Sequence, residues 1–268
     1  MPLSSALPRA TVEPPAEITL RALSSQADYS ACVTLQRETW GAQFADYVPA
    51  SLLKVSQMVG GLCVGAFSAD GRMMGFVYGL MGVRDGRLIH WSHMLAVHPE
   101  YRDHGVGRRL KEYQRAVLRG QGIETIYWTF DPLVARNAHL NLNRLGTEVR
   151  EYLPDMYQDT GSQLHAFGTD RLVVSWPVTG PAPAARPLVA GAAWLRAPLA
   201  SAFGSEPLVR IEVPVDVSAI PVAQARAWRA ATRPAFVRLL AEGYRVIGFF
   251  TEERTRSYYV LAKKESAS

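Results

Sequence analysis

Residues 95–110 read LAVHPEYRDHGVGRRL, and this stretch decides the fold class. Its first residues are apolar enough for a buried strand, Pro99 ends that strand, and Gly105 and Gly107 open a helix. Glycines at such a turn let the backbone approach a ligand with no side chain in between. The N–H groups of the first helical turn and the positive end of the helix dipole attract an anion, and Arg102 adds charge. The stretch therefore predicts a strand–turn–helix site for a pyrophosphate.

The pattern R-x-x-G-x-G is weak by itself, and its context supports the prediction. The apolar positions Val106, Leu110, Tyr113 and Val117 step by four, three and four, so they form one stripe of an amphipathic helix. A Rossmann site is not expected, because the third glycine is missing and no acidic residue ends a following strand. A P-loop is not expected either, because no Gly-Lys-Ser/Thr is present. An ordinary glycine-containing turn is the alternative.

The 268 residues, 48% hydrophobic and 20% charged, are enough for one large domain or two modest ones. Strands alternate with helices on both sides of the opening stretch, which indicates an α/β sheet of mixed direction. We expect a disordered N-terminus at 1–16, an α/β domain at 17–178, a proline-rich linker or extended segment at 179–207, and a smaller αβ extension at 208–268.

Local turn signals define the elements. Asp70-Gly71 predicts a hairpin turn, and Asp85-Gly86 predicts a second turn before the next strand. IETIYWTF, residues 123–130, predicts a buried strand. The extension is predicted to hold a helix over about 221–242, in which Pro234 predicts a kink or a break into two helices.

The net charge and the number of cysteines limit the classes of ligand that the chain is expected to bind. The net charge of +5 suits an anionic small molecule, and the basic residues are too scattered to predict nucleic-acid binding. Cys32 and Cys63 are too few for a disulfide framework or a zinc site, so we expect two buried thiols and no metal. No stretch predicts a membrane span or a secretory signal, and a cytoplasmic location is expected.

The segment LAVHPEYRDHGVG resembles the acyl-CoA-binding signature of the GNAT acyltransferase superfamily, and the element order matches over roughly 17–178. Asn137 at the start of a short helix and Leu145-Gly146 at its end also fit that family. The resemblance implies a mixed, splayed β-sheet flanked by helices. The strand holding 90–97 would splay from the strand holding 123–130, with acetyl-CoA or succinyl-CoA in the gap.

The resemblance also implies which residues contact the cofactor. They are Leu95, Ala96 and Val97 for the pantetheine arm, Arg102, Asp103, His104, Gly105, Val106, Gly107 and Arg108 for the pyrophosphate, and Asn137 for the far arm.

Acyl transfer to an amine needs a base, and histidine is the natural one near neutral pH. His93 is four residues before Val97, so we expect the two to share a strand face, and a purely structural histidine is the alternative. Family members often carry a tyrosine acid where this chain has Leu142. Tyr152 and Tyr157 on the next strand are substitutes, and water is another.

Arginines near the acceptor side, namely Arg136, Arg144 and Arg150, could hold a carboxylate. The segment WRAATRPAFVRLLAEGYRVIGF resembles a longer GNAT branch with a C-terminal extension, some of whose members are thought to be amino-acid N-succinyltransferases.

The leading hypothesis is therefore an acyl-CoA-dependent N-acyltransferase acting on a small amine such as an amino acid. Two alternatives stay open, a CoA-binding protein without turnover and an enzyme that acylates protein N-termini or lysines. The extension could shape the acceptor pocket or form a homodimer interface.

Overall fold

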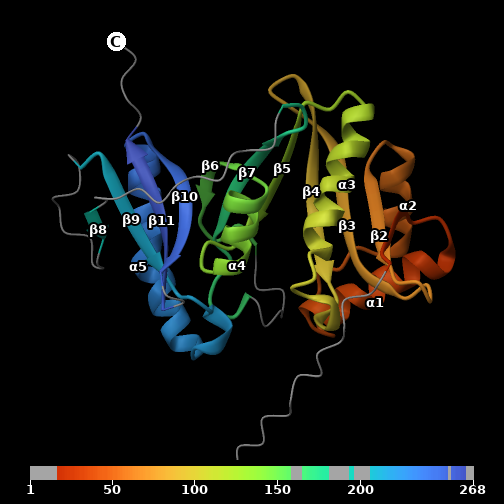
Figure 1. Ribbon diagram of the computed structural model, residues 1–268, viewed down its shortest axis with the longest axis horizontal. Helices are drawn as coiled ribbons and strands as arrows, with labels where there is room; N and C mark the ends of the chain where they lie inside the picture. The colour runs from red at the N-terminus through yellow and green to blue at the C-terminus, as the bar shows by residue number, and fades with distance from the viewer. Residues whose placement is uncertain (1–16, 158–164, 181–192, 196–205, 253–254, 264–268) are drawn as a thin grey trace, which may run out of the picture.

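The computed structural model describes residues 17–157, 165–180, 193–195, 206–252 and 255–263. Seven strands form one sheet in the order β1-β2-β3-β4-β5-β7-β6. The bounds are β1 (Thr19–Ala22), β2 (Leu62–Phe67), β3 (Met73–Arg84), β4 (Arg87–Val97), β5 (Thr125–Phe130), β6 (Glu148–Leu153) and β7 (Arg171–Pro177). Neighbouring strands are antiparallel except β4 and β5, which are parallel. The mixed, splayed sheet predicted from the sequence is confirmed (Figure 1).

The two predicted hairpin turns are confirmed. Gly71 lies between β2 and β3 with φ +82°, and Asp85-Gly86 joins β3 to β4 with φ values of 54° and 74°. A two-residue turn with positive φ at both positions matches the right-handed twist of its flanking strands. The Asp85-Gly86 turn fixes the register between β3 and β4, and β4 is the central strand of the sheet.

Helices cover both faces of the sheet. Helices α1 (Gln26–Trp40) and α2 (Ala50–Met58) pack on one face, and α3 (Val106–Gly120) packs on the other (Figure 1). Helix α1 begins where the Ser25 side chain accepts from the Asp28 N–H and Asp28 accepts from the Ser25 N–H, a complete capping box. After β5 come the short α4 (Ala135–Ala138) and the π-helical turn η2 (His139–Arg144).

A second sheet has the order β10-β11-β9-β8 and carries one long helix. Its elements are β8 (Ala193–Leu195), β9 (Leu208–Val213), α5 (Val222–Ala241), β10 (Tyr244–Glu252) and β11 (Arg256–Lys263). Strand β8 lies inside the segment predicted as a linker and pairs parallel with β9. Most of that predicted linker, and the predicted disordered N-terminus at 1–16, lie outside the described residues.

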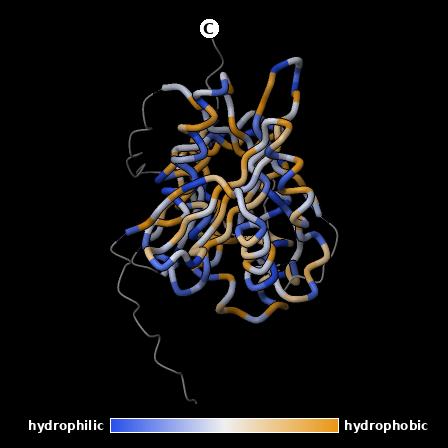
Figure 2. Tube along the Cα trace, turned by 90° about the vertical axis from the view of Figure 1, so that its right-hand side faces the viewer, coloured by the Kyte–Doolittle hydropathy of each residue, from blue (hydrophilic) through white to orange (hydrophobic). Residues whose placement is uncertain are grey.

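One apolar core joins the second sheet to the β5–β7 half of the first. Phe236 of α5 stacks on Tyr152 of β6 with ring centroids 5.2 Å apart, and it meets Tyr259 of β11 edge-on at 5.1 Å. The Tyr259 hydroxyl donates to the Pro132 carbonyl at 2.8 Å. Hydrophobic segments accordingly gather in the interior strands (Figure 2). The extension therefore covers one flank of the first sheet.

Helix α5 corrects one expectation. Of the two outcomes predicted at Pro234, a kink or a break, the break does not occur, because a single helix runs from Val222 to Ala241. Proline removes the hydrogen bond to the carbonyl four residues earlier, here that of Ala230. Both Pro234 and Ala230 are exposed, so water can satisfy that carbonyl.

Two further expectations concern the cysteines and the membrane. Cys32 and Cys63 are free and buried, as predicted. Within the described part of the chain, no helix is both long enough and apolar enough to cross a membrane.

Candidate active site

The site lies where β4 and β5 part. These strands pair at only two positions, His90 with Ile126 and Trp91 with Tyr127, and beyond them β4 continues to Val97. A cleft of about 360 Å³ opens between the separated strands. Strand backbone without a neighbouring strand presents unpaired N–H and C=O groups, which a ligand can bind.

Side chains from both sheet faces line the cleft. They include Trp40, Phe44 and Asp46 from α1 and the loop after it, Ser92 to Leu95 from β4, Lys111 from α3, Trp128 to Asp131 from β5, Arg136, Asn137, Leu140 and Asn141 around α4, and Tyr157, His165, Phe167 and Arg171. The cleft therefore passes between the strands from the α1–α2 side to the α3–α4 side.

His93 is the extra residue of a β-bulge. The β3–β4 register pairs Tyr78 with Met94 and Gly79 with Ser92, so His93 has no partner in the ladder. Its ring lies 6.1 Å from the Tyr78 ring, on the α1–α2 side. Leu95, by contrast, packs on the α3 side together with Val97. The expectation that His93 shares a face with these residues is therefore wrong, because the bulge shifts the alternation of the strand.

The surroundings of His93 keep its imidazole neutral near pH 7. Surrounding protein atoms desolvate the ring and lower its pKa, while the negative charge of Asp46 partly opposes that shift. His93 nevertheless stays exposed to the cleft. A neutral, accessible imidazole beside a gap in the sheet can accept a proton from an amine.

The predicted anion loop takes the expected shape. Asp103 and Gly105 have φ of 68° and 74°, and α3 begins at Val106 with no side chain capping its N–H groups. Arg102 donates from Nε to the Val97 carbonyl at 3.3 Å, which ties the loop to the end of β4. A Cβ on Gly107 would sit 3.6 Å from Val97 Cγ2, an ordinary contact, so the fold itself does not require glycine there.

The other residues predicted to hold the cofactor have different surroundings. Val106 and Ala96 are buried in the core, whereas Leu95 and Asn137 line the cleft. Arg108 is exposed and donates to Glu112 at 2.7 Å. His104 lies half-buried in the loop.

Arg136 lies closer to this loop than the sequence indicates. Burial lowers the pKa of Arg102, and the positive charge of Arg136 lowers it further. The charge of Arg136 thus acts on Arg102 at the loop, and Arg136 itself lines the cleft. Arg150, the other predicted acceptor residue, donates from Nε to Ser175 Oγ at 2.6 Å and pairs with Glu148, so it is not among the described residues lining the cleft.

The structure separates the two predicted tyrosines. Tyr157 lines the cleft, with its hydroxyl 3.4 Å from Thr129 Oγ1 and its ring stacked on His165 at 6.0 Å. Tyr152 lies in the core, where its hydroxyl donates to Asp170. Leu142, at the position where the family often has a tyrosine, is buried in the same core. Of these residues only Tyr157 can reach a bound ligand.

Comparison with known proteins identifies this arrangement. Residues 29–146 match the family model described as acetyltransferase (GNAT) family. This chain contains a GNAT acetyltransferase domain. By that domain it is an acyl-CoA-dependent N-acyltransferase. No curated protein matches the chain.

Solved structures resemble the GNAT domain in fold at low sequence identity. A chain of the NatC complex bound to Gag peptide and CoA is 16% identical, with a TM-score of 0.50 over 61% of this chain and 99% of that chain. The ribosomal-protein-S18-alanine N-acetyltransferase from Escherichia coli is 19% identical, with a TM-score of 0.49 over 62% and 96% of the two chains. An aminoglycoside 6'-N-acetyltransferase complexed with coenzyme A is 16% identical, with a TM-score of 0.44 over 61% and 98%.

Sequence reasoning missed a charged group at the end of β5. Asp131 lines the cleft and accepts from Arg229 of α5 at 2.6 Å, and Arg171 Nη1 lies 3.5 Å from the same carboxylate oxygen. One carboxylate thus faces two guanidinium groups. The signal was available, because Asp131 directly follows the buried strand at 123–130, and polar residues at strand ends often serve a site.

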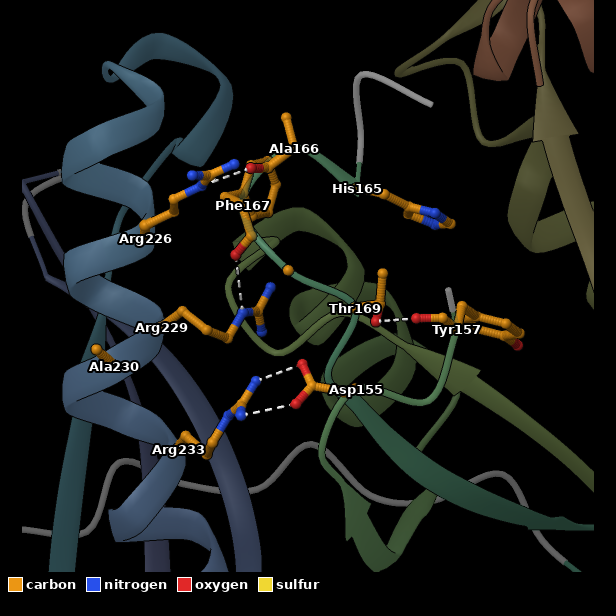
Figure 3. A pocket seen from close by; sticks show the side chains of 11 residues that line it. Asp155, Tyr157, His165, Ala166, Phe167, Thr169, Arg226, Arg229, Ala230 and Arg233 are labelled. Carbon is orange, nitrogen blue, oxygen red and sulfur yellow. Dashed lines mark hydrogen bonds and ion pairs between the residues drawn. The ribbon is translucent and has the colours of Figure 1, made fainter. Parts of the chain in front are cut away.

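A second hollow of about 530 Å³ lies between α5 and the segments around residues 155 and 168 (Figure 3). Arg233 binds Asp155 through two hydrogen bonds and also binds Asp170, while Arg226 donates to the Ala166 carbonyl. The carboxylates around Arg233 offset its charge. We call these contacts of Arg226 and Arg233 the seam, and the seam primarily attaches α5 to the GNAT domain. Tyr157, His165 and Phe167 line both hollows.

No group of acidic, histidine or cysteine side chains in the described chain is arranged to hold a metal ion.

Proposed function

We propose that this enzyme transfers an acyl group, such as acetyl or succinyl, from coenzyme A to the amine of a small molecule such as an amino acid. Transfer is direct, within a ternary complex. The separation of β4 from β5 carries the proposal, because it opens a cleft beside a neutral histidine and next to the N-terminus of α3. The NatC complex named above was solved with CoA, which supports the same choice of acyl donor.

The donor is proposed to bind along β4 and the N-terminus of α3. The uncapped N–H groups of α3, with Arg102 and Arg136, would hold the pyrophosphate, since helix N-termini and guanidinium groups both attract phosphate. The backbone from Leu95 to Val97 would pair with the pantetheine arm, and Asn137 would contact the arm from α4. Gly107 fits this arrangement, because the absence of a Cβ leaves space for the ligand. The packing of the protein itself would accept a Cβ at this position.

The acceptor is proposed to be small and to carry a carboxylate. A cleft of about 360 Å³ suits a small molecule better than a folded protein surface. The guanidinium group of Arg171 lines the cleft and shares the Asp131 carboxylate with Arg229, so it could also bind an acceptor carboxylate. A free amino acid has an amine that His93 could deprotonate and a carboxylate that the arginine end of the cleft could bind.

The proposed chemistry uses one base and the backbone of the bulge. Neutral His93 takes a proton from the acceptor ammonium, and the freed amine attacks the thioester carbonyl. Backbone N–H groups left unpaired at the bulge stabilise the oxyanion. Attack forms the C–N bond, collapse of the oxyanion breaks the C–S bond, and the second amine proton passes through Tyr157 or water to the leaving thiolate.

The extension is proposed to shape the acceptor end of the cleft. Arg229 of α5 fixes Asp131, and Phe167 and His165 lie between the cleft and the second hollow. A homodimer through the second sheet is the other proposal for this unit, and the two are compatible.

A thiol-release screen tests the function. Several acyl-CoAs, including acetyl-CoA and succinyl-CoA, are paired with each amino acid and with amines that lack a carboxylate. We expect free thiol with at least one carboxylate-bearing acceptor and little with the matching decarboxylated amine. Saturable binding of CoA without thiol release for any pair would instead favour a binding protein without turnover.

A further inference from the structure

A buried lysine lies at the point where β4 and β5 separate. Lys111 of α3 is 2% exposed, and its Nζ donates to Ser92 Oγ at 2.8 Å and to Gln114 Oε1 at 3.4 Å. The same Nζ lies 3.6 Å from the centre of the Trp128 ring. Ser92 and Trp128 each come directly after the last paired positions, Trp91 and Tyr127. Lys111, Ser92 and Trp128 all line the cleft, so they form its closed end.

The charge of Lys111 has no counterion among the described residues. Its hydrogen bonds go to a hydroxyl and an amide, and none of the described ion pairs includes it. The next polar side chain, His90, is 3.1 Å from Gln114 through Nε2. Burial lowers the pKa of His90 to about 3, with the Lys111 charge contributing, so His90 is neutral and is not a counterion.

Burial therefore favours the neutral form of Lys111 in the free protein. Desolvation holds the pKa of Lys111 well below its usual range. A buried lysine without a carboxylate costs free energy that a well-packed apolar residue would not. An anion that enters the closed end would provide the missing counterion, and the charge-assisted hydrogen bonds formed there would be strong.

We propose that Lys111 and Ser92 form a subsite for the far end of the acyl group and select acyl-CoAs whose acyl chain ends in a carboxylate, such as succinyl-CoA. This inference rests on the proposed function, which places the thioester at the bulge formed by His93. Ser92 is the neighbouring residue of β4, so an acyl chain directed away from the pantetheine arm runs toward Ser92 and Lys111. An acetyl group would leave the Nζ of Lys111 without a counterion.

The test measures dissociation constants for acetyl-CoA and succinyl-CoA by titration, so it does not depend on turnover. Wild type, Lys111→Met and Lys54→Met are compared. Methionine matches the length of lysine and suits an apolar wall, and Lys54 on α2 serves as the control outside the cleft. We expect wild type and Lys54→Met to bind succinyl-CoA at least tenfold more tightly than acetyl-CoA. In Lys111→Met the preference should disappear while acetyl-CoA affinity stays within about threefold.

Ser92→Ala provides a second variant that leaves Lys111 in place. We expect it to reduce the preference for succinyl-CoA by about threefold to tenfold. Equal affinities in wild type, or a parallel loss of both affinities in Lys111→Met with the fold intact by circular dichroism, would overturn the subsite. If the preference is seen but no acceptor releases thiol, the subsite stands and the proposed function fails. If acetyl transfer occurs without any preference, only the subsite fails.

Discussion

The β4–β5 boundary and the β9–β11 boundary differ in how completely the strands pair. β9 and β11 are joined at six consecutive positions, and Tyr258 to Leu261 of β11 are fully buried. β4 and β5 are joined at two positions, and the residues beyond are histidine, serine and tryptophan facing a cleft. Continuous pairing satisfies the backbone and produces a core, whereas interrupted pairing leaves backbone groups and polar side chains available to a ligand.

The largest expected effect comes from removing the fully paired region. Deleting residues 180–268 would expose the core face of β5–β7 that Phe236 and Tyr259 cover, and it would remove Arg229 from Asp131. We expect insoluble or inactive protein, because large exposed apolar surfaces aggregate. Soluble yield and thiol release are the measurements. A soluble and fully active truncation would show that the two sheets are independent.

The second prediction concerns the interrupted region. His93→Ala should lower kcat about 100-fold while the affinity for acyl-CoA is unchanged, because only proton transfer is lost. The burial-lowered pKa of His93 places the acidic limb of the wild-type pH–rate profile below the ordinary imidazole value of 6.5. That limb should vanish in the variant. His139→Ala, outside the described cleft lining, is the control, and an unchanged profile in His93→Ala would remove His93 from the base role.

A third prediction separates stability from catalysis at the seam. Arg233→Met leaves Asp170 buried without its ion pair, which should cost about 3 kcal/mol of unfolding free energy and lower Tm by about 6 to 12 °C. The lowered pKa of Asp170 makes this contribution complete above about pH 4 and lost as the pH falls through the folded-state value. Thermal denaturation at pH 7 and at pH 3 measures both effects.

Arg226→Met is the matched control for the seam, because Arg226 is exposed and donates to a backbone carbonyl. We expect its Tm to stay within about 2 °C of wild type. Equal losses in the two variants would mean that the Asp170 ion pair does not stabilise the seam.

Local sequence signals predicted the elements, including the turn between the strand and the helix at residues 95–110. Gly71 and the pair Asp85-Gly86 adopt positive φ, and the apolar stripe from Val106 to Val117 requires one packed helix face, so each signal depends on nearby residues alone. Of the kink or break predicted at Pro234, the break is wrong, because whether a carbonyl can turn to water depends on which helix face is exposed.

Long-range register explains what the sequence did not reveal about the site. The bulge at His93 arises from the pairing of β4 with β3. The alternation of apolar and polar residues within β4 does not reveal it. Lys111 reads as an ordinary charged helix residue until β4 and β5 are placed against it, and Arg229 meets Asp131 only because α5 packs on the first sheet. Tyr152 and Tyr157 are alike in sequence and differ only in whether they face the core or the cleft.

The most direct test of the central claim, that acyl-CoA binds where β4 separates from β5 and α3 begins, is a titration of acetyl-CoA into wild type and Gly107→Ala, with Tm measured in parallel. Alanine fits the fold at this position and favours helix by about 0.5 to 1 kcal/mol, so Tm should be equal or higher. The added methyl should weaken acetyl-CoA binding at least tenfold, because it occupies the space between α3 and the end of β4. Equal affinity for the two proteins, or no binding to wild type, would contradict this account of the site.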